Sequence, residues 1–419
     1  MVAFIYSLAA LALILSVGYA MRAQGRSQGL YIQVGLILFV LVLTYVASLI
    51  QFSGYADIVR MHNEMLSAQT YGFSYLLKEY LTSPGSAVLL YFVSPSASSA
   101  ILQSFAAFLF FAALAYIIFI TYKTQSFPVL PFLVTCWLAI SSFSLSGMVG
   151  GVRNFPAMGL SSAAILSITL RNKKKGIVPA LLCCVAAGLF HVGAWVQLIL
   201  FILSSIKKTK IRICINIILA LYGLFAITGA TLAMKFLPGK SFWSGIYSKV
   251  NGYFISGSSF DMYSSVNRMV LMYSVFLLIV VALLIYIKNE KKTISIYTKI
   301  NTYADYFVLP KPYINYIITY VCFCLGSITS GTPFRRYAAL LVFNVIPLVT
   351  IVISQIFYKP VSSSYSYIDK TLTSSDTNNK LWMAKKFGVL QMTALVIIII
   401  VLIVFMYNVW RQNMGSYIM

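Results

Sequence analysis

Long uninterrupted apolar segments are the feature of this sequence that most restricts its fold. They run for roughly 15–23 residues each, close to the length that a helix needs to cross a bilayer. They recur along all 419 residues, of which 60% are hydrophobic and only 9% are charged. Because lipid offers no partners to backbone N–H and C=O groups, such segments close their hydrogen bonds within helices. The sequence therefore predicts an all-α, polytopic transmembrane bundle that forms a single integral membrane domain over residues 1–419.

We expect about twelve spans. They cover residues 2–20, 30–52, 100–121, 127–147, 153–170, 177–190, 192–206, 213–233, 269–287, 313–331, 335–357 and 388–409. The first segment has no basic residues ahead of it, which predicts a retained span and not a removed signal peptide. The sixth and seventh segments are short for full spans, which predicts a tilted hairpin or one that stops below the outer surface.

The basic residues predict the orientation of these spans. The net charge is +23, but the lysines are spread over short loops, which is typical of orientation in a bilayer and not of a nucleic-acid interface. About two thirds of the 31 basic residues fall in alternate loops, which we therefore place inside, with both termini outside. The outer segments are then 53–99 and 234–268, and 359–386 is a flexible cytoplasmic loop. In the first of these, TYGFSYLLKEYL predicts an interfacial helix.

Five arginines fall on the outer side, against this charge bias: Arg60, Arg153, Arg268, Arg335 and Arg336. Arg153 follows a glycine-rich turn in GMVGGVRNFPAMGL and opens a span, and the pair in SGTPFRRYAALL is expected in the first turn of another. A cation there opposes the helix macrodipole by about 0.3–1 kcal/mol unless an anion binds. A guanidinium group can also donate two parallel hydrogen bonds to the oxygens of one phosphate. The pattern predicts a site for a phosphate-bearing substrate; the alternative, favoured for Arg268, is that these side chains reach for lipid headgroups.

Two further residues are candidates for proton transfer. His191 ends the sixth segment in GLFHVGAW, and an unperturbed imidazole pKa of about 6.5 suits acid–base chemistry. The alternative is a histidine with a structural hydrogen bond. Asp57, Arg60 and Glu64 share one face of a predicted helix. This face is either part of a site or a set of solvated ion pairs. Asp57 is the better candidate for proton transfer because it follows directly on a span. The six cysteines lie in apolar segments without metal-ligand spacing, so we predict packing roles, no metal and no cofactor.

Four segments together resemble the EpsG-like branch of Wzy-type polysaccharide polymerases. They are SGYADIVRMH, GGVRNFPAMGLSSAAILSITLRNKKKG, GLFHVGAW and GTPFRRYAALLV, and the resemblance covers about 53–206 and 325–345. The order of arginine, basic loop and histidine over 153–191 is its most specific part. The chain departs from the family pattern behind Asp57, where Arg60 and His62 stand in place of a second aromatic residue.

The resemblance implies a GT-C-like, metal-independent glycosyltransferase of the bacterial plasma membrane, with an outer-face cavity that opens to the exterior. Its substrate would be an undecaprenyl-diphosphate-linked glycan, transferred onto the non-reducing end of a new lipid-linked unit. Membrane lipid, a chain-length regulator and a flippase would be its partners. The diphosphate would meet a set of arginines: Arg153, Arg335, Arg336, Arg268 and Arg60. Arg153 would also act catalytically, and His191 or Asp57 would deprotonate the acceptor hydroxyl.

Other classes of membrane protein compete with this interpretation. A lipid-linked glycan flippase or transporter is the first, although ion-coupled transporters place carboxylates at mid-membrane, and none of the eight acidic residues lies in mid-span. An O-antigen ligase would share the arginine–histidine chemistry. An acyltransferase would turn its histidine toward a cytoplasmic donor, contrary to the predicted side of His191.

Overall fold

The computed structural model describes residues 26–50, 57–124, 149–171, 176–236, 273–285, 309–328 and 331–357, with the single residues Ala12 and Leu271. These residues form helices and no strands, which confirms the all-α prediction. The labelled elements are α2 (Arg26–Ser48), α3 (Asp57–Glu79), α4 (Pro84–Val93), the 3₁₀ helix η1 (Ser94–Ser96), α5 (Ser99–Thr124), α8 (Asn154–Arg171), α9 (Ile177–Phe190), α10 (Val192–Ser204), α11 (Thr209–Phe236), α14 (Lys311–Gly326), α15 (Gly331–Asn344) and α16 (Ile346–Phe357).

Several of these helices have the length and apolar composition of membrane spans. Within the described ranges, three can cross a bilayer: Gly29–Ser48, Ser99–Lys123 and Thr209–Ala226. A fourth exists if the bent pair α15 and α16 forms one span. Long apolar helices of this kind are those of a membrane protein.

Other predicted spans are shorter or lie outside the described residues. α9 and α10 are confirmed as short apolar helices of 14 and 13 residues, and Tyr273–Ile285 is a further short one. The predicted spans 2–20, 127–147 and 388–409 all lie outside the described part, as do the predicted outer segment 234–268, apart from its first residues, and the loop 359–386.

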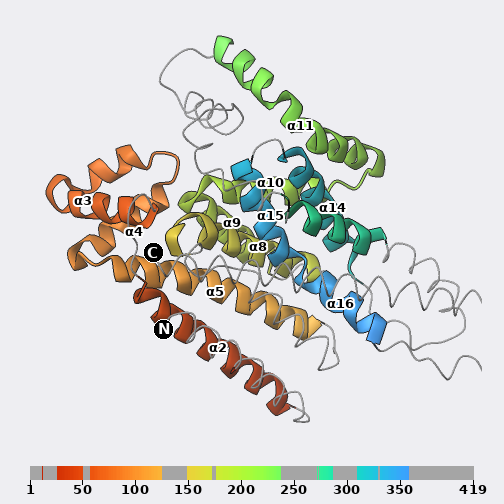
Figure 1. Ribbon diagram of the computed structural model, residues 1–419, viewed down its shortest axis with the longest axis horizontal. Coiled ribbons are helices and arrows are strands. Elements are labelled where there is room, and N and C mark those ends of the chain that lie inside the picture. Colours follow the sequence, from red (N-terminus) through yellow and green to blue (C-terminus); the bar gives the residue numbers. More distant parts are fainter. Residues whose placement is uncertain are drawn as a thin grey trace, which may run out of the picture.

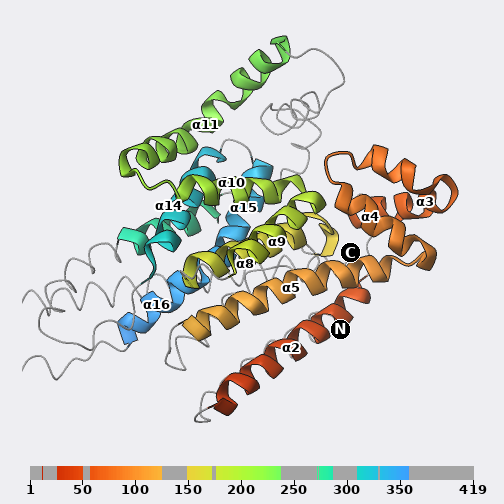
Figure 2. The same ribbon diagram turned by 180° about the vertical axis from the view of Figure 1, so that it is seen from behind.

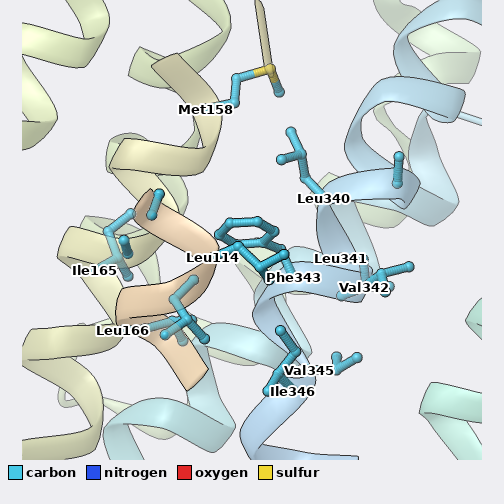
Figure 3. Packing of buried hydrophobic residues seen from close by; sticks show 14 of the residues in the cluster. Leu114, Met158, Ile165, Leu166, Leu340, Leu341, Val342, Phe343, Val345 and Ile346 are labelled. Carbon is cyan, nitrogen blue, oxygen red and sulfur yellow. The ribbon is translucent and has the colours of Figure 1, made fainter. Parts of the chain in front are cut away.

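The central core lies where α8 meets α5 and α15. α2 packs on α5, α5 on α8, and α8 in turn contacts α9, α10 and α15. Figure 3 shows Leu114 of α5 and Ile165 of α8 near Phe343 of α15, and all three are fully buried. Side chains of this size each contribute about 1.5–3 kcal/mol when removed from water, and in a bilayer it is close packing that holds them together.

A proline divides the predicted span 335–357 into α15 and α16. The two helices meet at a bend of 48°. Pro347 has no N–H to donate to the preceding turn, and its ring opposes a continuous helix. The hydroxyl of Tyr313 on α14 stabilises the bend, because it donates to the Asn344 carbonyl (2.9 Å) and accepts from the Leu348 N–H (3.2 Å).

Helix α11 lies at the edge of the bundle and presents an apolar surface (Figure 1). It packs mainly on α14, where Gly326 allows contact: a Cβ on this glycine would lie 2.1 Å from the Leu219 carbonyl oxygen. On its other side, Ile218, Leu224 and Phe225 are each 65% exposed. An apolar face of this size on a helix of spanning length suits contact with lipid.

The segment between α2 and α5 folds as a helical hairpin with a break inside α3. Gly72 adopts φ 73° and ψ −173°, a conformation that side chains other than hydrogen disfavour, so α3 consists of two helical pieces. Tyr71 is 67% exposed before the break, whereas Leu76 is fully buried after it. The break therefore interrupts the interfacial helix that the sequence predicted over TYGFSYLLKEYL, although the rings of Tyr71 and Tyr75 stay in contact, with centroids 5.6 Å apart.

Candidate functional site

One end of the helix bundle carries nearly all the predicted site residues that the structure describes. The hairpin of α3 and α4 lies at the end where α5, α8 and α10 begin and where α9 terminates (Figures 1 and 2). A short turn, Gly151–Arg153, precedes α8 at this end. The Ala157 N–H donates to the Arg153 carbonyl (3.2 Å), which makes Arg153 the N-cap residue of α8. Pro156 stands third in the helix, where a missing N–H is tolerated, as predicted.

The structure brings Asp57, Arg60 and Arg153 together, although 96 residues separate the first from the last. Arg60 Nη2 donates to Asp57 Oδ1 at 2.6 Å. Arg153 Nη2 reaches both carboxylate oxygens of Asp57, at 3.3 Å and 3.4 Å. Side-chain exposure is 57% for Arg60, 24% for Asp57 and 16% for Arg153. The carboxylate thus lies between an exposed guanidinium and a largely buried one.

Tyr80 joins this cluster from the turn that follows α3. The Arg153 guanidinium lies over its ring, 4.9 Å from the centroid, in cation–π geometry. The Tyr80 hydroxyl donates a short hydrogen bond to Glu64 Oε2, and Arg60 Nε lies 3.8 Å from Oε1 of the same carboxylate. Burial raises the pKa of Tyr80 well above its usual value although Arg153 opposes the shift, so the hydroxyl stays protonated and donates. Burial tends to lower the pKa of Arg60, but its carboxylate neighbours, Asp57 first, raise it overall.

Two buried polar atoms at the start of α8 have no hydrogen-bond partner. They are Arg153 Nε and Asn154 Oδ1, and Asn154 as a whole is 8% exposed. An unsatisfied buried polar group costs about 1–3 kcal/mol. One of these atoms is a donor with a positive charge and the other is an acceptor. A ligand that carries both an anionic oxygen and a hydroxyl group would satisfy both.

His191 lies in the turn between α9 and α10, where its ring caps the second helix. Its Nδ1 accepts from the Gly193 N–H at 3.0 Å. A nitrogen that accepts carries no proton, so the neutral ring has its proton on Nε2. In this arrangement Nδ1 is the acceptor of the ring and the Nε2–H is its donor.

The turn that contains His191 is held by neighbouring helices on two sides. Ser86 of α4 donates to the Phe190 carbonyl (2.8 Å), a C-terminal group of α9. On α15, the Tyr337 hydroxyl donates to the Gly193 carbonyl at 3.3 Å. His191 is therefore positioned by the hairpin α3–α4 and by the helix that carries the arginine pair.

Arg335 and Arg336 lie deeper in their helix than predicted. The sequence placed them in the first turn, but α15 begins at Gly331, so they stand in the second turn. Thr332 and Pro333 form the first turn because a proline N–H is not needed there. Both arginines are half-buried, and Arg335 lies within electrostatic reach of Arg336 and Tyr273. The bond from Tyr337 to Gly193 links this region to the His191 turn.

The Asp57–Arg153 cluster and the His191 turn both adjoin the first turns of α8. Ala157, one turn after Arg153, packs against Ala187 and Ala194 on the two helices that flank His191. Arg268, the fifth predicted arginine, lies outside the described residues. Sequence reasoning missed Tyr80, Asn154 and Tyr337, since none stands in a recognisable pattern.

Over the part of the chain that the structure describes, no group of three or more His, Cys, Asp or Glu side chains could hold a metal ion. In comparisons with known proteins, no family model, no curated protein and no solved structure matches this chain.

Proposed function

We propose that this protein is a membrane glycosyltransferase of about twelve spans that polymerises undecaprenyl-diphosphate-linked oligosaccharide units at the outer face of a bacterial plasma membrane. One observation carries the proposal: a largely buried arginine at the start of α8, Arg153, with an unpaired Nε and long contacts to Asp57. It lies at the end of the bundle where the charge bias disfavours basic residues. The resemblance over 53–206 and 325–345 supplies the substrate class.

The reaction would need charge stabilisation more than any other contribution. An acceptor hydroxyl attacks the anomeric carbon of the donor sugar, the bond from that carbon to the diphosphate oxygen breaks, and negative charge develops on the leaving lipid diphosphate. A guanidinium that faces this oxygen stabilises the transition state. Arg153 can turn toward it because its contacts with Asp57 are 3.3–3.4 Å, longer than a strong charge-assisted bond. Arg335 and Arg336 would bind the same diphosphate.

The proton of the acceptor hydroxyl would pass to Asp57. Both oxygens of this carboxylate accept from guanidinium groups in the structure. When Arg153 moves to the diphosphate, one of these contacts is released and Asp57 can accept a proton. His191 would instead donate from Nε2 to a substrate oxygen, because its Nδ1 caps α10.

The test is a reaction of the purified protein in detergent or liposomes with the lipid-linked repeat unit from its source organism. Successive additions would appear as a ladder of products on a gel. A ligase would transfer chains only to a lipid core, and a flippase would change the side of the bilayer on which the unit lies without lengthening it. Either of those results, without a ladder, would refute the polymerase proposal.

A further inference from the structure

Helices α9 and α10 are too short to cross the hydrocarbon part of a bilayer. With 14 and 13 residues, they extend over about 21 Å and 20 Å at 1.5 Å per residue. The hydrocarbon core is about 30 Å thick. If both helices begin and end in the membrane, something else covers roughly 10 Å of apolar thickness at the end where they meet.

Helix α4 occupies that position. Ser86 donates to the Phe190 carbonyl at the C-terminus of α9. One residue earlier, a Cβ on Gly85 would lie 3.1 Å from the Leu189 carbonyl, so the two backbones approach closely. Both views show α4 beside the end of α9 (Figures 1 and 2).

The exposed side chains of α9 form one apolar stripe. Val178 (67%), Leu182 (63%), Val185 (37%) and Leu189 (42%) follow at spacings of four, three and four residues, which is one face of a helix. A stripe of this kind on a membrane helix faces lipid.

The exposed large side chains on α4 and just before it are also apolar. Leu81 is 77% exposed and Phe92 is 76% exposed, with Val88 (41%) and Tyr91 (44%) between them. Large apolar side chains this exposed are unfavourable in water, and a continuous patch of them marks a contact surface. The first piece of α3 differs, because its exposed residues there are mostly polar or charged, as Asn63 and Thr70 illustrate.

We propose that α4 is embedded in the leaflet on its side of the membrane, where it extends the lipid-facing surface of α9 to the full thickness of the hydrocarbon core. The ligand of this surface is the acyl chains of phospholipids. The hairpin is then part of the membrane domain and not an aqueous loop. The His191 turn lies below the level of the lipid headgroups, covered by α4. This inference does not depend on the glycosyltransferase proposal.

The experiment measures the surroundings of position 92 in the full-length protein in lipid nanodiscs. An environment-sensitive fluorescent amino acid is incorporated at Phe92, at Leu182 as a lipid-facing reference, and at Asn63 as a water-facing reference. Quenching is recorded with nitroxide-labelled lipids and with iodide. Position 92 should match position 182, with lipid quenching at least about threefold stronger and iodide quenching at least about threefold weaker than at position 63.

Two outcomes would overturn the proposal. Iodide quenching at position 92 equal to that at position 63 would place α4 in water. Protection from both quenchers would show that protein, from this chain or a second copy, covers the surface. Because a probe at Phe92 can disturb the hairpin, Leu81, which is equally exposed, serves as a second labelling position. The proposal requires the same quenching pattern, strong by lipid and weak by iodide, at positions 81 and 92.

Discussion

The two ends of helix α8 carry arginines in opposite environments. Arg153 caps the N-terminus, is 16% exposed, contacts Asp57 and lies 4.9 Å from the ring centre of Tyr80. Arg171 ends the same helix, is exposed, and lies 6.0 Å from the ring centre of Tyr116. The macrodipole favours a cation at the C-terminus and disfavours one at the N-terminus. The position of Arg171 is therefore favoured by helix electrostatics. The position of Arg153 is unfavourable unless an anionic partner or ligand compensates for it.

The same difference separates the two ends of the bundle. All three acidic residues of the described part, Asp57, Glu64 and Glu79, lie on α3 at the Arg153 end. The opposite end has exposed lysines, for example Lys123 and Lys208. Exposed single charges orient a membrane protein, whereas a partly buried cluster with unsatisfied atoms is suited to binding. The following substitutions test this contrast, from the largest expected effect to the smallest.

Replacing Arg153 by alanine should abolish most glycan polymerisation. The loss of one contact to developing charge costs about 2.7–4 kcal/mol, which is a hundredfold or more in rate. The measurement is the initial rate of ladder formation with lipid-linked repeat units. Arg171→Ala is the matched control at the other end of α8 and should stay within about twofold of wild type. If both substitutions lowered the polymerisation rate equally, Arg153 would have no special role compared with Arg171.

His191→Asn should separate helix capping from chemistry. Asparagine is a good N-cap residue, so the thermal stability of the protein should be retained. The imidazole donor is lost, and the rate should fall by about tenfold to a hundredfold. His191→Ala should lose the cap as well, with a cost of about 1 kcal/mol in unfolding free energy. A His191→Asn variant with full activity would assign the histidine a purely structural role.

Asp57→Asn should lower both stability and activity, with a smaller effect on rate than Arg153→Ala. The amide keeps the shape but removes the charge beside two guanidinium groups, at a cost of roughly 1–2 kcal/mol given the partial exposure of the pair. Thermal unfolding in detergent and the initial rate of ladder formation are the measurements. If Asp57 accepts the proton, the rate should fall by more than the loss of stability explains. An unchanged rate in a folded Asp57→Asn variant would contradict the assignment.

Tyr80→Phe should have the smallest effect. It removes the donor to Glu64 and keeps the ring beneath Arg153, so the expected loss is about 1 kcal/mol of stability. Tyr80→Leu removes the ring as well and should add about 0.5–1 kcal/mol. Thermal unfolding of both variants, alone and combined with Arg153→Ala, gives the coupling between the ring and the guanidinium. If the coupling is absent, the cation–π contact contributes nothing.

Much of the fold could be predicted because lipid leaves few choices. The segments 177–190 and 192–206 form α9 and α10 within two residues of the predicted ends. Errors occurred where single residues act on the backbone. Pro347 divides one predicted span, and Gly72 interrupts a helix whose aromatic pattern suggested a continuous face. Apolar composition does not register such breaks, because it is an average over many residues.

The candidate site was predicted only in part. Arg153 and His191 stood out because arginine is unexpected on that side and histidine is rare in the chain. Asp57 was a candidate as well, but its contact with Arg153 was not predicted, since 96 residues separate the two. Tyr80 was missed because it belongs to a turn with no distinctive motif. The sequence suggested a base role for His191, and it did not predict the bond from the Gly193 N–H to Nδ1 on which the proposed donor role rests.

The sequence by itself determined that this chain forms apolar helices, and which loops carry the lysines that predict their orientation, since both properties follow from local composition and the energetics of lipid. Tertiary structure alone decided that Arg153 meets Asp57 and Tyr80, that α4 lies on the end of α9, and that Tyr313 supports the bend after Asn344. These contacts depend on how far each helix extends and how it turns about its axis. Those quantities are set by the packing of neighbouring helices and are not encoded in any one segment.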